Sequence, residues 1–552
     1  MTAGEAAAVS NHPAVVNVSS AARPVFSTGA PVYDFMPEAI HMPLPQLPLN
    51  IASGFGVGVV LVDSGINENA DLLGKVTYSE NFSTDYSTND HYGHGTHVAG
   101  LIAGNGINSL IGYSQDIHGV APGVHFINLK VLNGQGASTD GQVIQAIMRA
   151  IALKKLHPEW NIKVMNLSLG RPVFEPSFKD PLCQAVEAAW LNGITVVVAA
   201  GNEGRLNTAH TNGYGTIASP GNDPLAITVG SINTESTASQ TDDLMTSYSS
   251  KGPTIVEHVV KPDLVAPGNK LFAVLAPNST LSTMSGSVLV PAPFGSPQYL
   301  VLSGTSMAAA VTTGAVAAVL ANENLTPDQV KARLMKTADK LPAKAYQIPV
   351  IDPATGKTTQ FGVQNDIFTV GAGYLDLGAA LAAKGDPNFT IPANENAASP
   401  VAVPNLSSDG KTVSINLKNY LAVYGKDVFT VWGSDAFTVW GSDAFTVWGS
   451  DTFTVWGSDA FTVWGSFTVW GSSVFNPIRG SDAFTVWGSD TFTVWGSDAF
   501  TVWGSSAVWG SSGAFNTVWS ADTFTVWGSD AFTVWGSSVN GDIVTGDTVK
   551  GH

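Results

Sequence analysis

The sequence predicts an α/β fold, built as a doubly wound and mainly parallel sheet, followed by a repeat-built all-β module. Two observations predict the first part: short, nearly unbroken apolar runs, and helical patterns that alternate with them. Strands that alternate with helices form parallel sheets whose strands are buried on both faces. A third observation, an eight-residue repeat that begins near residue 428, predicts the second part.

Five apolar runs are expected to form the strands of the sheet. They are apolar on both faces, as buried parallel strands are. The runs cover residues 57–63, 125–132, 163–169, 194–201 and 226–232. Ligands of open α/β sheets bind at the carboxyl ends of the strands, so polar residues that follow these runs are the first candidates for a site.

Four segments carry helical patterns, at residues 97–104, 141–155, 181–193 and 325–338. The last one begins with a capping box, in which Thr326 is followed by Pro327 and, three residues after Thr326, by Gln329. A capping box satisfies free backbone N–H groups at a helix N-terminus, and proline is well tolerated in the first turn.

Shifts in composition divide the chain into six parts. We expect a Pro/Ala-rich N-terminal arm (1–50), a globular domain (51–384), a linker (385–408), a strand-like entry segment (409–427), the repeat (428–537) and a tail (538–552). Within the arm, the proline-rich segment 31–48 is expected to be extended. It is interpreted either as an extended segment that lies across the functional cleft and restrains activity, or as a disordered leader.

Charge and composition exclude several classes of function. The 552-residue chain has a net charge of -18, from 43 acidic and 25 basic residues, which argues against a nucleic-acid binder. No apolar run reaches the roughly 18 residues of a membrane span. A single cysteine, Cys183, excludes an internal disulfide and a cysteine-based zinc site. The N-terminus lacks the pattern of a secretory signal. An extracellular or cell-surface location is expected, with a cytoplasmic one as the alternative.

Four short segments carry residues suited to acyl transfer. Asp63 ends the first expected strand in DSG, and His94 opens a helix in HGTHVAG. Asn202 follows another strand in AAGNEG, and Ser306 lies in GTSMA, where a glycine turn leads into a helix. A serine hydroxyl becomes a nucleophile when an imidazole takes its proton, and a buried carboxylate fixes that imidazole. The chain order is Asp, His, Ser.

These four segments, in this order, resemble the signature segments of the subtilisin-like serine proteases (subtilases, peptidase S8). The resemblance covers roughly residues 50–384. It implies a catalytic triad of Asp63, His94 and Ser306, with Asn202 as an oxyanion donor. The matching histidine is the first in HGTH, so His97 is not the catalytic one. The implied activity is a serine endopeptidase that cleaves proteins or peptides through an acyl-enzyme.

The resemblance also implies a set of substrate-binding residues. They are Gly136, Ala137, Ser138, Ser168, Leu169, Gly170, Ala200, Gly201 and Ala218. Ala218 as the floor of the primary pocket, with glycine walls at Gly170 and Gly201, favours medium to large apolar side chains at P1, and Glu203 at the rim is compatible with a basic one. A structural calcium ion is implied at Asp71 and Asn108, since such oxygen ligands suit calcium. The chemistry itself needs no cofactor.

The repeat reads FTVWGSDA with few interruptions from Phe429 onwards. Period-two alternation places Phe and Val on one face and Thr and Trp on the other. One unit cannot bury its face alone, so we expect a β-solenoid or a stacked meander. Its role is interpreted either as a stiff acidic stalk or as a module for glycan binding, surface attachment, adhesion or self-association. An alternative for the whole chain is a catalytically inactive subtilisin-like scaffold in an adhesion or structural surface protein.

Overall fold

A computed structural model describes residues 35–43, 53–110, 113, 116–206, 211, 213–284, 286–291, 296–341, 345–351 and 355–403. Beyond residue 403 it describes the backbone of separate strands. Most of the expected N-terminal arm, of the entry segment 409–427 and of the tail therefore lies outside the described residues.

The described domain is built on one eight-stranded sheet. Its order is β2-β3-β1-β4-β5-β6-β7, and β8 pairs with β6. The strands are β1 (Gly58–Asp63), β2 (Val76–Asn81), β3 (His125–Lys130), β4 (Ile162–Leu167), β5 (Thr195–Ala199), β6 (Ile227–Asn233), β7 (Leu244–Met245) and β8 (Leu264–Pro267). All pairs are parallel except β6–β7. The predicted α/β fold with a mainly parallel sheet is confirmed.

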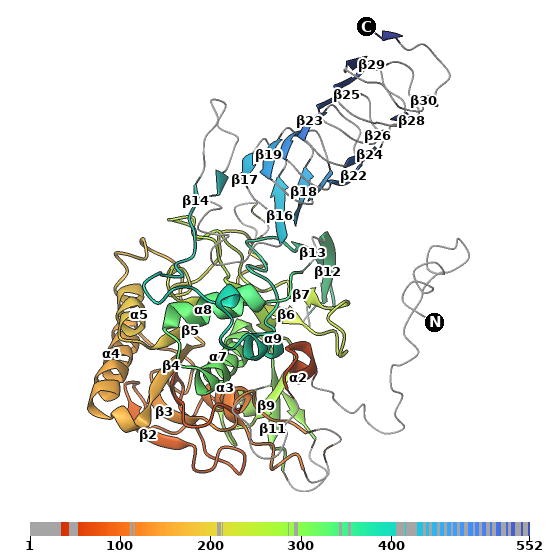
Figure 1. Ribbon diagram of the computed structural model, residues 1–552. Helices are drawn as coiled ribbons and strands as arrows, with labels where there is room; N and C mark the ends of the chain where they lie inside the picture. Colours follow the sequence, from red (N-terminus) through yellow and green to blue (C-terminus); the bar gives the residue numbers. More distant parts are fainter. Residues whose placement is uncertain are drawn as a thin grey trace.

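Helices cover this sheet in pairs, with α3 packed on α7 and α4 on α5 (Figure 1). The helices are α2 (Met36–Ala39), α3 (His94–Ala103), α4 (Asp140–Leu156), α5 (Pro181–Leu191), α6 (Thr280–Thr283), α7 (Thr305–Asn322), α8 (Pro327–Thr337) and α9 (Leu377–Ala382), and two 3-10 helices are η2 (Pro158–Trp160) and η3 (Pro387–Phe389). The capping box at Thr326 and Gln329 is confirmed at the start of α8.

Helix α7 is the one helix within the described ranges that is long and apolar enough to cross a membrane. However, 78% of its 18-residue apolar window is buried inside the fold. It contacts strands β4, β5, β6 and β8. This packing is that of a core helix, whose small side chains let it lie close to the sheet.

Two smaller sheets were not expected from the sequence. One has the antiparallel order β10-β11-β9, formed by β9 (Leu271–Val274), β10 (Val288–Val290) and β11 (Tyr299–Leu302). The other is the hairpin of β12 (Ala345–Ile351) and β13 (Thr358–Gln364). These strands are short or lie in segments of mixed polarity, so no apolar run marked them.

The N-terminal arm differs from the expected extended form. Its described part forms α2, with Pro37 in the first turn, and Met36 and Ile40 are fully buried. The backbone N–H of Leu377 donates to the Ile40 carbonyl at 2.9 Å, which ties the arm to the start of α9. A proline fits the first helical turn, so proline content alone did not exclude a helix.

The expected linker 385–408 is not a linker over its described part. Residues 385–403 include η3 and the buried side chains of Ile391 and Ala397. The Arg333 Nε donates to the Phe389 carbonyl at 2.9 Å. The segment also adds a bridge between Val259 and Val401. The domain therefore continues to about residue 401.

Within the repeat, strands pair in parallel with the second-next strand. Phe429 lies opposite Phe445, and Trp432 opposite Trp448. Sheets of order β16-β18-β20-β22-β24, β17-β19-β21-β23-β25-β27-β29-β31 and β26-β28-β30 result. The strands from β14 onwards are β14 (Ala402–Val403), β15 (Ser414–Ile415), β16 (Val428–Gly433), β17 (Thr438–Trp440), β18 (Ala444–Gly449), β19 (Phe453–Gly457), β20 (Phe461–Trp464), β21 (Phe467–Gly471), β22 (Phe475–Arg479), β23 (Phe484–Gly488), β24 (Phe492–Trp495), β25 (Ala499–Trp503), β26 (Val508–Trp509), β27 (Phe515–Trp519), β28 (Val526–Trp527), β29 (Phe532–Trp535), β30 (Ile543–Val544) and β31 (Lys550–Gly551). The predicted β-solenoid stays a prediction.

Candidate active site

A buried carboxylate and a histidine meet at the carboxyl end of β1. Asp63 ends this strand and is fully buried, and His94 is the first residue of α3. The Nδ1 of His94 donates to Oδ1 of Asp63 at 2.8 Å and lies 3.0 Å from Oδ2. Because a carboxylate only accepts, Nδ1 carries the proton and Nε2 is left as the basic nitrogen.

The pKa of His94 follows from this contact. Burial alone would lower the pKa, but the charge of Asp63 and its hydrogen bond raise it above its usual value, with a further contribution from Asp90. His97 behaves differently: burial lowers its pKa to about 3, and its Nε2 lies 3.0 Å from the Leu300 carbonyl. His94 is therefore suited to take up a proton, whereas His97 stays neutral.

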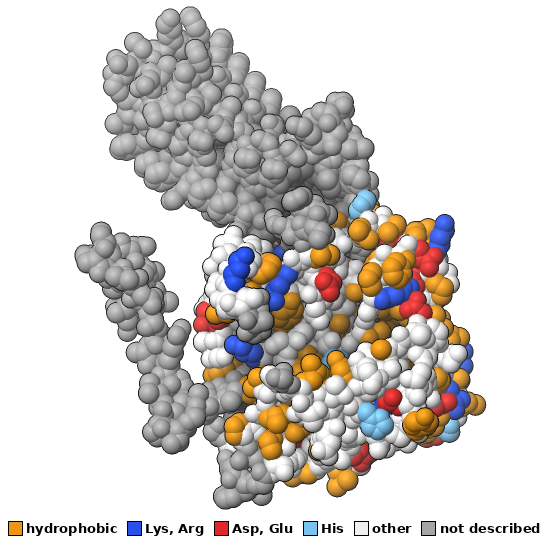
Figure 2. Space-filling view, turned by 180° about the vertical axis from the view of Figure 1, so that it is seen from behind, with side chains coloured by type: hydrophobic (Ala, Val, Ile, Leu, Met, Phe, Trp, Pro, Cys, Tyr) orange, Lys and Arg blue, Asp and Glu red, His pale blue; other side chains and the backbone are white. Residues whose placement is uncertain are grey.

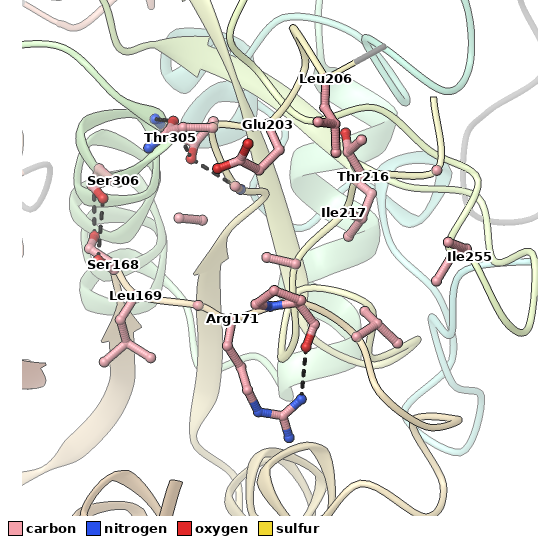
Figure 3. Close-up of a pocket in the computed structure, with 18 residues that line it drawn as sticks. Ser168, Leu169, Arg171, Glu203, Leu206, Thr216, Ile217, Ile255, Thr305 and Ser306 are labelled. Atoms are coloured by element: carbon pink, nitrogen blue, oxygen red, sulfur yellow. Dashed lines mark hydrogen bonds between the residues drawn. The ribbon is translucent and has the colours of Figure 1, made fainter. Parts of the chain in front are cut away.

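Ser306 is the second residue of α7, so its backbone N–H has no partner within the helix. Its Oγ donates to the Ser168 carbonyl at 3.2 Å, and the Ser168 Oγ donates to the Ser306 carbonyl at 2.9 Å (Figure 3). In this structure the Ser306 hydroxyl thus donates to the Ser168 carbonyl and not to His94. For proton transfer, the Ser306 hydroxyl must donate to Nε2 of His94 instead.

Asn202 follows β5 and faces the start of α7. Its Oδ1 accepts hydrogen bonds from the backbone N of Thr305 at 3.0 Å and from the Thr305 Oγ1 at 3.1 Å. A backbone N–H can only donate, so this contact fixes which amide atom is oxygen. The Nδ2 group of Asn202 remains as a donor. It lies beside Gly304, since a Cβ added to Gly304 would be 3.5 Å from Nδ2.

A cavity of about 570 Å³ opens next to Ser306 and Asn202. In Figure 3, Ser306 lies at one side of this cavity, and Leu206 and Ile255 lie toward the other. Ser168, Leu169, Gly170, Gly201 and Ala218, all in the predicted substrate-binding set, line this cavity. A Cβ on either glycine would lie 3.1 Å from the Ala218 Cβ, so the glycines keep the cavity wide.

Ala200 is the one expected pocket residue that lines neither described cavity. Its backbone N donates to the Val229 carbonyl, and its carbonyl accepts from the Ala218 backbone N, both at 3.0 Å. Ala200 therefore supports the position of Ala218 rather than a pocket wall.

A second cavity of about 420 Å³ adjoins the first. His94 borders it together with the expected edge residues Gly136, Ala137 and Ser138, and both cavities share Ser168, Leu169, Gly170 and Arg171. This shared wall brings His94 and Ser306 to one cleft. Arg171 is held rigidly, because its guanidinium contacts Asp140 at 2.9 Å and Asp180 at 2.8 Å.

The expected calcium ligands, Asp71 before α3 and Asn108 after it, line neither described cavity. Asp71 is fully buried; its Oδ1 accepts from the Asn108 backbone N at 2.8 Å and its Oδ2 from the Tyr299 hydroxyl at 2.6 Å. Both carboxylate oxygens thus already have protein donors. A cation at Asp71 would have to use the remaining lone pairs, so calcium binding stays a prediction.

Within the described ranges, one group of His and carboxylate ligands lies close enough to share a metal ion. It consists of His41, Asp339 and Asp376. The His41 Nδ1 lies 2.9 Å from Asp376 Oδ2 and 3.5 Å from Asp339 Oδ2. These contacts join α2 to the start of α9, and they already give each group an ionic partner.

The sequence analysis missed three residues that hold the site together. Thr305 orients Asn202, and Ser64 and Asp90 bond to the segments around Asp63 and His94. Thr305 lies inside the GTSMA segment, and Asp90 lies four residues before His94. Their role depends on hydrogen-bond geometry, which residue type and spacing do not reveal.

The comparisons with known proteins decide the family. The family model described as the subtilase family, Peptidase_S8, matches residues 54–373. The chain belongs to the subtilase family.

Two relatives in sequence support the same assignment. The chain is similar to serine protease AprX of Bacillus subtilis (strain 168), with 39% identity over 292 residues, which are 52% of this chain and 62% of AprX. It is similar to subtilisin DY of Bacillus licheniformis, with 31% identity over 299 residues, which are 53% of this chain and 87% of that protein. Among solved structures, Sphericase has a TM-score of 0.42 and 26% identity over 52% of this chain and 84% of its own. The chain thus spans less than two thirds of AprX.

Proposed function

We propose that this subtilase hydrolyses peptide bonds with Asp63, His94 and Ser306 as its triad. The contact between the buried Asp63 and His94 Nδ1 carries the proposal, because it orients Nε2 as a base. The proton on Ser306 Oγ passes to Nε2 of His94, and Oγ attacks the scissile carbonyl carbon. The protonated His94 then gives that proton to the leaving amine. Water hydrolyses the acyl-enzyme with the same base.

Two donors are available for the oxyanion of this reaction. One is the backbone N–H of Ser306 at the N-terminus of α7, where the helix dipole favours negative charge. The other is the Nδ2 group of Asn202, which is oriented by Thr305. Both are fixed before substrate binds, which is the requirement for effective stabilisation of the transition state.

Substrates are proposed to be proteins or peptides with medium to large apolar P1 residues. The cavity beside Ser306 has apolar walls at Leu169, Ile217 and Ile255. Glu203 at its rim adds the possibility of a basic P1 residue. The edge at Gly136–Ser138 is suited to pair with an extended peptide by β-augmentation. A cleavage profile on a peptide library in which acidic P1 residues dominate would refute the proposed pocket.

The triad is tested by Ser306→Ala. A fluorophosphonate probe is expected to label the parent chain and not this variant, and peptidase kcat is expected to fall by several orders of magnitude. Asn202→Ala serves as a partial-loss control that keeps the nucleophile. Equal labelling of the parent and Ser306→Ala would contradict the assignment. Absence of labelling in the parent would favour the inactive scaffold.

The repeat is proposed to form a β-solenoid in which one turn contains two octapeptides. The parallel pairing of Phe429 with Phe445, sixteen residues along the chain, supports this period. We propose that the module serves surface attachment, adhesion or self-association, with glycans as a further class of ligand. Sedimentation equilibrium of the chain with and without residues 409–552 tests self-association. A molar mass equal to that of one chain in both cases would contradict it.

Location, charge and calcium complete the proposal. We propose an extracellular or cell-surface location. Nucleic acid is not a proposed partner, because the net charge is -18 and the face drawn in Figure 2 mixes acidic, basic and apolar side chains. Structural calcium at Asp71 and Asn108 is proposed from the resemblance. An unchanged Tm in calcium and in chelator would argue against it.

A further inference from the structure

A second buried carboxylate, Asp90, lies beside the Asp63–His94 pair. It precedes His94 by four residues and is 1% exposed. Each of its oxygens accepts two hydrogen bonds. Oδ1 accepts from Ser64 Oγ at 2.8 Å and from the Gly93 backbone N at 2.7 Å, and Oδ2 accepts from Thr96 Oγ1 at 2.6 Å and from the Thr96 backbone N at 2.8 Å. Four donors suit an ionised carboxylate and hold it in one position.

These bonds connect the two segments that carry the catalytic pair. Gly93 and Thr96 flank His94, while Ser64 directly follows Asp63. The backbone N of Ser64 donates to Asp63 Oδ1 at 2.7 Å, and its Oγ accepts from the Gly95 backbone N at 2.9 Å. Asp63 and His94 are thus joined twice, once directly and once through Ser64 and Asp90.

The surrounding backbone leaves little room for either segment to shift. Asn67 bonds to the same turn, since its side-chain Oδ1 accepts from the Asp90 backbone N at 2.9 Å and its Nδ2 donates to the Asp90 carbonyl at 3.1 Å. A Cβ added to Gly95 would lie 2.2 Å from the Gly65 carbonyl oxygen. The two segments therefore meet backbone to backbone, and the Asp90 bonds fix their register.

The titratable neighbours of His94 come from three parts of the chain. Asp63 comes from β1, Asp90 from the loop before α3, and His97 from the next turn of α3. His97 is kept neutral, since burial lowers its pKa to about 3. The Tyr92 ring lies 6.4 Å from the His94 ring. Asp63 and Asp90 are therefore the two anions that act on the imidazole, and the charge of Asp90 raises the pKa of His94 after that of Asp63.

We propose that Asp90 is a positioning residue of the peptidase reaction, which orients His94 through Gly93, Thr96 and Ser64 and stabilises the imidazolium with its charge. The inference rests on the proposed triad. A cap that serves only the stability of α3 would make the same bonds, so the test must separate the two roles.

The first test is Asp90→Asn in the full chain. Asn keeps the size of the side chain but removes its charge and one of its two acceptor atoms. We expect kcat to fall about 10- to 100-fold, because a small displacement of a catalytic group costs this much. KM is expected to stay within about twofold. The acid limb of kcat/KM is expected to move to lower pH, because His94 loses a neighbouring anion and becomes easier to deprotonate.

A second measurement does not depend on activity. The His94 imidazole is titrated by NMR in the Ser306→Ala background, with and without Asp90→Asn, and a lower midpoint is expected in the double variant. Ser64→Ala removes the link to Asp63 but keeps the charge of Asp90. It is expected to lower kcat with a smaller change in the pH profile. Asp376→Asn is the matched control: Asp376 is 8% exposed, caps α9 by accepting from the Ala379 N at 2.7 Å, and lines neither described cavity.

The outcomes separate the proposals. If Asp90→Asn lowers Tm like Asp376→Asn but leaves kcat, the acid limb and the His94 titration unchanged, Asp90 is only a cap and the inference is wrong. If Asp90→Asn does not fold, an unchanged kcat in Ser64→Ala overturns it instead. A failure of the triad itself is seen separately, as a lack of fluorophosphonate labelling in the parent chain.

Discussion

Replacing Asp263 with Asn is expected to destabilise the peptidase domain by about 3–5 kcal/mol. Asp263 lies just before β8, and its side chain and those of Lys261 and Lys331 are 0% exposed. Lys261 Nζ lies 2.7 Å from Oδ2 of Asp263, and Lys331 Nζ lies 3.1 Å from Oδ1. One carboxylate therefore contacts two buried lysine amines, and burial lowers the pKa of Lys331 to about 7.

The magnitude follows from what the substitution leaves behind. Asn has no charge, so both lysines would remain buried without this anion, and breaking a buried pair from one side costs about 3–5 kcal/mol. Asp263 also accepts from the Thr228 backbone N at 2.7 Å through Oδ2 and from Ser399 Oγ at 2.5 Å through Oδ1. An Asn amide has a single acceptor oxygen, so it can accept from only one of these two groups.

The pKa of Asp263 gives the pH dependence of this effect. Burial works to raise it, but the charges of Lys261 and Lys331 outweigh burial and hold the pKa below its usual value. The folded state therefore binds fewer protons than the unfolded state. The stabilisation by Asp263 is present above the unfolded pKa and is lost as the pH falls through the folded pKa.

The assay is urea unfolding at neutral pH, followed by circular dichroism, in the Ser306→Ala background to prevent autolysis. Glu159→Gln is the control, because Glu159 is 63% exposed and pairs only with His157 at the surface, so its midpoint is expected to match the parent. Lys331→Met leaves one lysine for one carboxylate and is expected to cost less than Asp263→Asn. A loss below about 1 kcal/mol in Asp263→Asn, with an unchanged m-value, would refute the reasoning.

Three further predictions concern the cleft and the pH profile of stability. Asn202→Ala is expected to lower kcat by about 10²–10³ with KM nearly unchanged, a magnitude taken from the corresponding asparagine of a subtilisin; a change confined to KM would speak against an oxyanion donor. Gly170→Val is expected to shift the kcat/KM ratio from Phe toward Ala at P1, because its side chain would meet Ala218, and an unchanged ratio would remove Gly170 from the pocket. Burial raises the pKa of Asp243 to about 7, so the folded state binds more protons between pH 4 and 7 and stability falls as the pH rises through that window. Asp243→Asn is expected to raise Tm at pH 8 more than at pH 5, and an equal pH dependence in both proteins would contradict this.

Five of the eight strands were predictable because they are apolar runs buried on both faces, whereas the half-exposed β2 and the short β7 and β8 were not expected. The run 57–63 corresponds to β1 at Gly58–Asp63, and the run 226–232 to β6 at Ile227–Asn233. Helix α3 begins at His94, where the HGTHVAG segment was expected to open a helix, three residues before the apolar pattern starts. Its first turn is held by Asp90 and not by apolar packing, so hydrophobic periodicity could not locate its start.

The candidate site was predictable as a set of residues but not as an arrangement. Asp63, the last residue of a buried strand, and Asn202, three residues after another, were candidates because α/β sheets place ligands at the carboxyl ends of their strands. The contact of Ser306 Oγ with the Ser168 carbonyl, and the orientation of Asn202 by Thr305, depend on rotamers and on distances between segments more than 100 residues apart. A pattern within one stretch of sequence carries no information on such contacts.

The wrong linker boundary has a physical cause of the same kind. Segment 385–403 is rich in Pro and Asn and has no periodicity, so composition favoured a linker. What fixes the segment are polar groups of α8: Asp328 Oδ1 accepts from the Ala397 N at 2.8 Å, and Gln329 Nε2 donates to the Ile391 carbonyl at 3.1 Å. Asp328 and Gln329 lie on a helix that the sequence predicts, but a helical pattern does not indicate that their side chains bind the backbone of another segment.

Both ends of the described domain contact helices that follow α7 in the sequence, namely α9 and α8. At the N-terminal end, His41 contacts Asp376 and Asp339 beside α9. At the C-terminal end, Ser399 bonds to Asp263 and to Lys331 of α8. The same carboxylate that contacts two buried lysines therefore also binds the last described segment before the repeat. A domain cut at residue 384 would lose the Ser399 hydroxyl from this cluster and would expose the surface that Ile391 and Ala397 cover. Residues 385–401 therefore belong to the fold, and the repeat is joined to the domain after residue 401.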